Sequence, residues 1–144
     1  MTKVLIKKLD PSVELPVYKT NGASGMDLMA FIQDPINLKP HSSCLVPTGI
    51  SVAFPSDFEI QIRPRSGLAA KNSISVLNTP GTIDSDYRGE IKVILYNHGD
   101  NDFLINQPAF SYYLLKPSAK YRIHGNIFHF INSFLPLKNN WPSN

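Results

Sequence analysis

The sequence contains one cysteine and no long apolar run, and both shortages restrict what the chain can be. Because Cys44 stands alone, a disulfide framework and a cysteine-rich metal site are excluded, and we expect a reducing compartment such as the cytoplasm. No apolar run approaches the ~20 residues of a membrane-spanning helix, so no membrane partner is expected. The opening MTKVLIKKLD is too short and too charged for a signal peptide.

Acidic residues are missing from the last quarter of the chain. Residues 1–106 contain all 11 Asp and Glu and 10 of the 14 Lys and Arg, a net charge of −1. Residues 107–144 contain the other four basic residues, a net charge of +4, together with eight of the 15 aromatic residues. The overall charge of +3 therefore belongs to the last quarter and does not predict a nucleic-acid partner. We predict a globular domain over 1–106 and a divergent or frameshifted segment over 107–144.

Long helices are not expected in residues 1–106, because proline and glycine recur every few residues. Apolar and polar side chains alternate through 57–63, and the apolar residues Ile91, Val93 and Leu95 occupy every second position of 90–97. This is the period of a half-buried strand. Weaker strand patterns and one helical turn complete the assignment: strands at 4–9, 26–31, 45–54 and 73–77, and a turn at 66–71. Many short strands separated by turns predict an all-β sandwich, jelly roll or barrel.

Two of the three candidate motifs are short loops. In ASGMDL, small residues precede Asp27 at the start of an apolar strand, where an aspartate alone is usually a turn or cap residue. In RPRSGLAAK, a strand runs into the helical turn. Arg65 offers bidentate phosphate contacts, and Ser66 and Gly67 offer N–H donors at a helix start. A solvated basic turn with a serine cap is the alternative interpretation of this second motif.

The third motif, NTPGTIDSDYRGE, has the composition of a hairpin between two strands. Pro80 and Gly81 predict a tight turn whose backbone groups can reach a flat ligand. Asp84 and Asp86 follow within five residues, and either carboxylate is able to act as a general base. Tyr87 lies next to them, and a simple polar hairpin tip is the alternative.

Taken together and in order, SGMDL, PRSGLA and GTIDSDYRG resemble motifs one to three of the trimeric dUTPases. The sister family of dCTP deaminases shares the fold, but RSGLA together with IDSDY favours the dUTPase branch. The resemblance implies a distorted jelly-roll, or β-clip, subunit in a homotrimer with active sites at subunit boundaries. It implies Mg²⁺-dependent hydrolysis of dUTP to dUMP and pyrophosphate, which limits uracil in DNA and supplies dUMP for dTMP synthesis.

The resemblance also implies a role for each motif residue. Asp84 matches the base that orients water for attack on the α-phosphorus, and Asp27 matches the aspartate that orders the metal indirectly, through water and triphosphate. Tyr87 matches the residue that packs on deoxyribose and leaves no space for a 2′-hydroxyl. The other substrate-binding residues divide into a phosphate group, Arg65, Ser66 and Gly67, and a uracil and sugar group, Asn78, Gly81, Thr82 and Ile83.

The resemblance ends near residue 106. Residues 107–144 contain no counterpart of motif four, an Arg-Ile-Ala-Gln run, or of motif five, a glycine-rich tail with an arginine and a phenylalanine. We favour a frameshift as the cause, and a diverged C-terminus that packs on the body or on a partner is the alternative. Without these motifs, the chain is expected to lack phosphate contacts, a core strand and much of the family's activity. A catalytically defective subunit or a regulatory module is the second functional interpretation.

Overall fold

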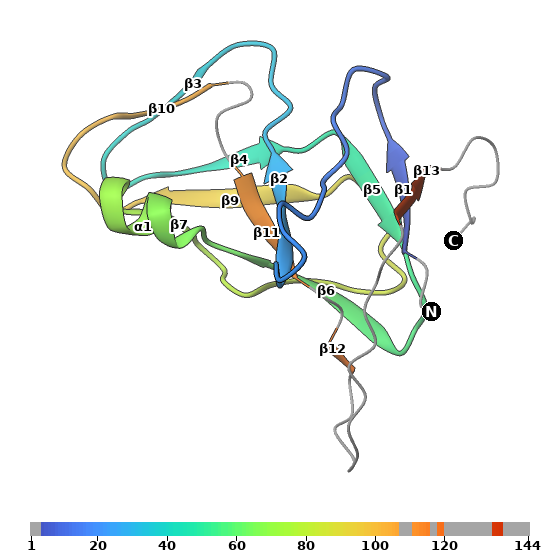
Figure 1. Ribbon diagram of the computed structural model, residues 1–144. Helices are drawn as coiled ribbons and strands as arrows, with labels where there is room; N and C mark the ends of the chain where they lie inside the picture. Colours follow the sequence, from blue (N-terminus) through green and yellow to red (C-terminus); the bar gives the residue numbers. More distant parts are fainter. Residues whose placement is uncertain (1–3, 107–110, 116–117, 120–133, 137–144) are drawn as a thin grey trace.

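The computed structural model describes residues 4–106, 111–115, 118–119 and 134–136 (Figure 1). Short strands make up most of the regular structure in these residues, with one helix, α1 (Ser66–Asn72). The strands are β1 (Val4–Lys8), β2 (Gly25–Met29), β3 (Ile36–Leu38), β4 (Ser43–Pro47), β5 (Ile50–Ala53), β6 (Phe58–Arg63), β7 (Ile74–Val76), β8 (Gly81–Ile83), β9 (Lys92–Asn97), β10 (Phe103–Ile105), β11 (Ser111–Leu115), β12 (Ser118–Ala119) and β13 (Phe134–Pro136). The predicted all-β class is confirmed.

The described strands pair into four small sheets that fold around one core (Figure 1). One sheet has the order β4-β9-β7 and another the order β13-β1-β5. The largest has the order β12-β6-β11-β2, with β8 also paired to β6, and β10 pairs with β3. Pairing is antiparallel except between β1 and β13. In the described part of the chain, no helix is long and apolar enough to cross a membrane.

The core forms because alternate strand residues point inward, as the sequence period predicts. In β9, Val93 and Leu95 are buried while Lys92 is exposed, and in β6 Ile60 and Ile62 are buried. Fully burying each such side chain contributes about 1.5–3 kcal/mol. The largest fully buried side chains are Ile6, Leu28, Leu38, Ile50, Ile60, Ile74, Ile91, Leu95, Ile105 and Val4.

The predicted strand over 45–54 is in fact two strands, β4 and β5. The chain turns between them at Gly49, whose φ is +67°. This left-handed conformation is unfavourable for residues with a Cβ atom, so glycine suits the turn. The apolar sequence on both sides conceals the turn, which is why a single strand was predicted.

The 78–90 motif is not a paired hairpin, contrary to the prediction. Its first limb, β8, pairs with β6, with Thr82 opposite Gln61, while the following strand β9 pairs with β4 and β7. Both edges of β9 are therefore already occupied, and β8 instead completes an open edge of β6. The motif connects two different sheets.

The expectation that the chain lacks a core strand here is also wrong, because the backbone forms one. Residues 111–115 form β11, which pairs with both β2 and β6. Strand pairing uses backbone N–H and C=O groups, so a strand forms here without the motif-four sequence. Most of the predicted separate segment 107–144 lies outside the described residues.

Candidate functional site

A pocket of about 320 Å³ brings together four of the predicted site residues: Thr82, Ile83, Asp84 and Tyr87. Asp84 is exposed, and it follows directly after β8. An exposed carboxylate beside a pocket is free to accept a proton from a bound water molecule. The rest of the wall comes from Leu45, Glu90, Ile91, Lys92 and Ile94.

Hydrogen bonds within the loop after β8 hold Asp84 and Tyr87 in place. The Tyr87 backbone N–H donates to the Asp84 carbonyl oxygen at 3.1 Å, closing a turn. The Arg88 guanidinium Nη1 donates to the Ser85 carbonyl at 2.6 Å and to the Tyr87 carbonyl at 3.1 Å. The Tyr87 hydroxyl donates to the Glu90 carbonyl at 2.8 Å. The loop is thus fixed largely by its own backbone oxygens.

Two glycines allow aromatic and amide side chains to approach the backbone closely. A Cβ atom at Gly89 would lie 2.6 Å from the Tyr87 hydroxyl oxygen, so the tyrosine lies directly against this glycine. A Cβ atom at Gly81 would lie 3.3 Å from Asn78 Nδ2, so the Asn78 amide lies beside the start of β8. Neither Asn78 nor Gly81 lines the pocket that contains Asp84.

Asp27 and the second motif form a separate group. The Arg65 Nε atom lies 3.7 Å from Asp27 Oδ1, and the two side chains are 39% and 15% exposed. Ser66 and Gly67 open α1 and are exposed, and a Cβ atom at Gly67 would meet nothing within 4 Å. The N-cap residue is Arg65, without a side-chain capping bond, so the alternative of a serine cap is wrong.

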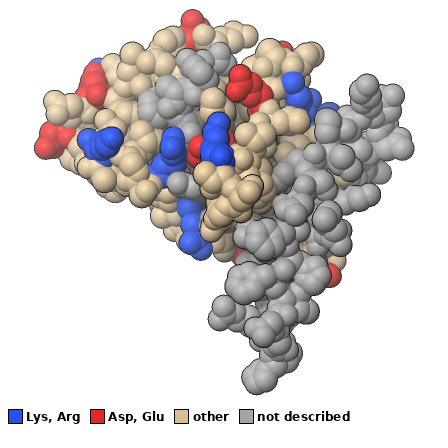
Figure 2. Space-filling view, in the orientation of Figure 1, with Lys and Arg blue, Asp and Glu red and all other residues tan. Residues whose placement is uncertain are grey.

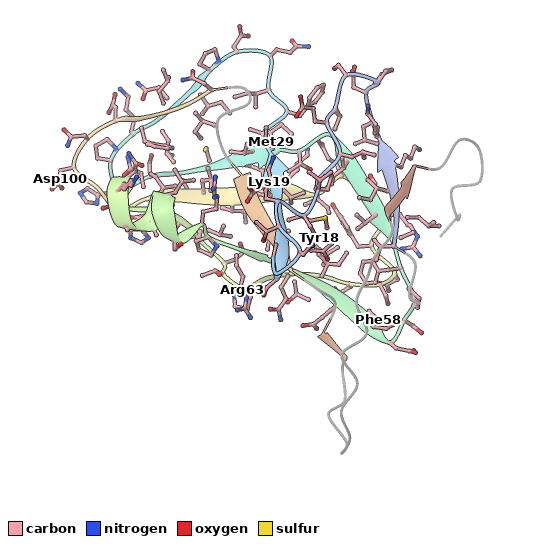
Figure 3. The ribbon with its side chains drawn as sticks, in the orientation of Figure 1. Tyr18, Lys19, Met29, Phe58, Arg63 and Asp100 are labelled. Atoms are coloured by element: carbon pink, nitrogen blue, oxygen red, sulfur yellow. The ribbon has the colours of Figure 1, made fainter. Side chains whose placement is uncertain are left out.

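The two groups lie toward opposite ends of β6, which Phe58 and Arg63 mark in Figure 3. The antiparallel register pairs Gly81 with Ile62 and Ile83 with Ile60, so β8 carries the chain away from the α1 end before Asp84 is reached. Figure 2 shows several Lys and Arg side chains on this face, with acidic side chains among them. One chain thus presents the pocket and the Asp27–Arg65 group at two separate places.

The pocket and the Asp27–Arg65 group each contain an oxygen donor of the type that a hard cation prefers. Among the described residues, no three His, Cys, Asp or Glu side chains cluster as a metal site. Asp84 lines the pocket, and Asp27 lies beside Arg65. Mg²⁺ keeps several waters and is usually bound by one or two carboxylates together with substrate phosphates, so a single carboxylate of either group fits an ion that phosphates also hold.

Sequence reasoning missed the part of the pocket wall that comes from β4 and β9. Leu45 and Ile94 are opposite each other in these strands, and Leu45 is more than half exposed. The sequence contained one signal for this wall. Ile94 is apolar although it is two residues after Lys92, and so lies on the same outward face of the strand. Glu90 was also missed, although it is the last residue of the third motif.

Comparisons with known sequences find one family and close relatives. A family model for dUTPase matches residues 12–109. A deoxyuridine 5′-triphosphate nucleotidohydrolase of Treponema denticola is 59% identical over 98 residues, which is 68% of this chain and 68% of the relative. The protein of the same name from Rickettsia bellii is 57% identical over 108 residues, 74% of this chain and 72% of the relative.

Solved structures with a similar fold come from staphylococcal phages. A dUTPase of phage phi11 of S. aureus, described with a structural Mg(II) ion, has a TM-score of 0.71 at 15% identity. The superposition covers 88% of this chain and 97% of the phage chain. The dUTPase of Staphylococcus bacteriophage 80alpha has a TM-score of 0.70 at 16% identity, with the same coverage. These likenesses bear out the predicted jelly-roll fold.

Proposed function

This chain belongs to the dUTPase family, and from that premise we propose that it hydrolyses dUTP to dUMP and pyrophosphate. The observation that carries the proposal is the gathering of Asp84, Tyr87, Thr82 and Ile83 around one pocket. The single cysteine supports a reducing compartment, the cytoplasm, as the site of the reaction.

In the proposed reaction, Asp84 orients a water molecule and accepts its proton. The water oxygen forms a bond to the α-phosphorus, on the side opposite the bridging oxygen. The bond between the α-phosphorus and the bridging oxygen breaks, and that oxygen leaves as part of pyrophosphate. Asp84 lies in a turn that the Tyr87 N–H closes, which supports its role as a base in a fixed position. Positioning and charge stabilisation supply most of the catalysis in phosphoryl transfer, so a fixed loop is what this chemistry requires.

We assign substrate selection to the third motif. The backbone of Gly81, Thr82 and Ile83 would read the uracil edge, with Asn78 beside it. Cytosine would leave buried donors and acceptors unpaired, which discriminates strongly between bases. Tyr87, which lies against Gly89, would pack on the deoxyribose and exclude a 2′-hydroxyl.

The phosphates are proposed to bind at Arg65, Ser66 and Gly67. The open space at Gly67 and the N–H groups at the start of α1 support close approach by an anion. Asp27 forms an ion pair with Arg65 at 3.7 Å and would hold Mg²⁺ indirectly, through water. When bound, Mg²⁺ neutralises charge that develops on the pyrophosphate.

A homotrimer would bring the pocket of one copy next to the Asp27–Arg65 group of another. The two lie toward opposite ends of β6 within one chain, which supports a site shared between copies. The outward face of β4 and β9 supports association, because Leu45 is 54% exposed there and Leu77, just after β7, is 52% exposed. Exposed apolar side chains of this kind are typical of surfaces that pair. The mass of the purified protein in solution tests the assembly.

The C-terminal residues are proposed to weaken the activity. The family match ends at residue 109, and residues 107–144 lack motifs four and five. Each charge-assisted hydrogen bond that these motifs would supply is worth about 1.5–3 kcal/mol, so the absence of several would reduce turnover by orders of magnitude. A frameshift is our preferred cause, and an Arg-Ile-Ala-Gln-like run in another reading frame of the gene would support it. An intact frame in relatives with this same tail would contradict it.

A catalytically defective subunit or regulatory module is the second candidate, favoured by the same missing motifs. Pyrophosphate release from dUTP separates the two candidates. We expect release that disappears in Asp84→Asn and persists in Asp86→Asn, since Asp86 is an exposed aspartate of the same loop that does not line the pocket. Absence of release from the unmodified chain would favour the defective subunit.

A further inference from the structure

Glu90 connects the pocket loop to the buried body of the domain. Its side chain is 21% exposed, and one carboxylate oxygen, Oε1, accepts a hydrogen bond from the Gly49 N–H at 2.9 Å. The other oxygen, Oε2, lies 3.6 Å from Lys92 Nζ. The backbone carbonyl of the same residue accepts the Tyr87 hydroxyl at 2.8 Å. A single residue thus joins the tyrosine to the turn between β4 and β5.

The Gly49 end of this connection is firmly held. Gly49 is buried with a φ of +67°, and a Cβ atom there would lie 2.5 Å from Val13 Cγ2 and 3.0 Å from Phe31 Cδ1. The turn therefore has little room to move. Its N–H group would be costly to leave unpaired, and the Glu90 carboxylate satisfies it.

The backbone that follows Glu90 is also fixed. The Ile91 N–H donates to the Ile50 carbonyl at 2.9 Å, and the Thr48 hydroxyl donates to the Ile91 carbonyl at 2.6 Å. Because the Glu90 carbonyl and the Ile91 N–H belong to one planar peptide unit, the bond to Ile50 orients this carbonyl, while the carboxylate bond to Gly49 anchors the same residue through its side chain. That carbonyl is therefore a rigid acceptor for a side chain on the loop.

Tyr87 depends on this acceptor. The tyrosine is 44% exposed, its ring lies against Gly89, and its hydroxyl donates to the Glu90 carbonyl. A half-exposed aromatic side chain with a single polar tether changes orientation readily when the tether moves. The direction of the ring at the pocket is thus set through Glu90.

We propose that Glu90 is a positioning residue: its carboxylate, bonded to Gly49, anchors the residue whose backbone carbonyl holds Tyr87 at the sugar side of the pocket. The proposal rests on the proposed function, which gives Tyr87 the contact with deoxyribose. Glu90 acts through Tyr87 and not on the phosphates, so its removal raises KM and weakens discrimination between dUTP and UTP. The effect on KM and on this discrimination is expected to exceed the effect on kcat for dUTP, because the Glu90 carboxylate bonds to Gly49 and not to Asp84.

The kinetic test compares Glu90→Ala and Glu90→Gln. We expect the ratio of kcat/KM for dUTP to that for UTP to fall about tenfold in Glu90→Ala, the factor of one neutral hydrogen bond. Glu90→Gln keeps an oxygen acceptor for Gly49 and should restore the ratio to within about twofold. The matched control is Asp102→Ala, which removes a carboxylate paired at 2.6 Å with Lys39 and leaves the ratio unchanged.

An equal ratio in Glu90→Ala and the unmodified chain would overturn the proposal, as would a glutamine variant no better than alanine. If Glu90→Ala does not fold, Glu90→Asp carries the same expectation, because its shorter side chain does not reach Gly49. Tyr87→Phe, which removes the tethered hydroxyl, should weaken the discrimination to the same extent.

A second readout does not depend on hydrolysis. In protein with ¹³C-labelled tyrosine rings, the Tyr87 NMR signal is identified by its absence in Tyr87→Phe. We expect this signal to shift and broaden in Glu90→Ala and to stay in place in Glu90→Gln and Asp102→Ala. An unmoved signal in folded Glu90→Ala overturns the role of Glu90. Failure of the unmodified chain to hydrolyse dUTP counts instead against the proposed function, whatever the ring signal does.

Discussion

Replacing Gly49 by alanine should destabilise the domain more than any ordinary surface change. Alanine at a φ of +67° costs about 1–2 kcal/mol, because its Cβ crowds the carbonyl oxygen. The added methyl would also lie 2.5 Å from Val13 Cγ2, and relieving such an overlap in a packed core costs about 1–3 kcal/mol. The sum, about 2–5 kcal/mol, is a large share of the 5–15 kcal/mol that is typical of a domain.

Urea unfolding at fixed protein concentration measures this change, and Gly22→Ala is the matched control. A Cβ atom at Gly22 meets nothing within 4 Å, so we expect that variant to stay within about 0.5 kcal/mol of the unmodified chain. Both variants reduce the freedom of the unfolded chain equally, so their difference isolates the turn. The melting temperature of Gly49→Ala should fall by roughly 5–15 °C. Equal stability of the two variants would refute the claim that the turn at Gly49 has no room for a Cβ atom.

Three further predictions concern the base, a buried hydroxyl and the thiol. Asp84→Asn should lower kcat for dUTP by about 10²–10⁴-fold without changing the unfolding midpoint, and an unchanged rate of pyrophosphate release would count against the base assignment. Thr48→Val should cost about 1–3 kcal/mol in urea unfolding, since it leaves the buried Ile91 carbonyl without its 2.6 Å bond, whereas Thr48→Ser should cost less. Burial raises the pKa of the Cys44 thiol, so at pH 8 the folded protein has less thiolate than the unfolded protein and should react more slowly with iodoacetamide; equal rates would contradict this.

Strand positions were predictable where side chains alternate over enough residues. The 57–63 and 90–97 patterns predicted β6 and β9, because inward residues such as Ile60 and Val93 recur at every second position. β3 and β10 have three residues each, which is too short for a period to be recognised. Partner choice was not predictable, since β8 pairs with a strand about twenty residues earlier and not with its neighbour.

The candidate site was predictable in its motif residues and not in its walls. Asp84 and Tyr87 stand in a short polar segment that the sequence displays directly. Leu45 and Lys92 reach the same pocket only because β4 and β9 pair, with Pro47 opposite Lys92, and such long-range register has no local sequence signal. The separation of Asp27 from Asp84 likewise depends on how β8 runs along β6.

The most direct test of a dUTP-hydrolysing pocket is pyrophosphate release from dUTP with Mg²⁺, by the purified full chain and by its Asp84→Asn variant. We predict measurable release from the chain, slower than from the Treponema denticola relative, and none above background from the variant. Equal release from both proteins, or none from either, would contradict a reaction centred on Asp84.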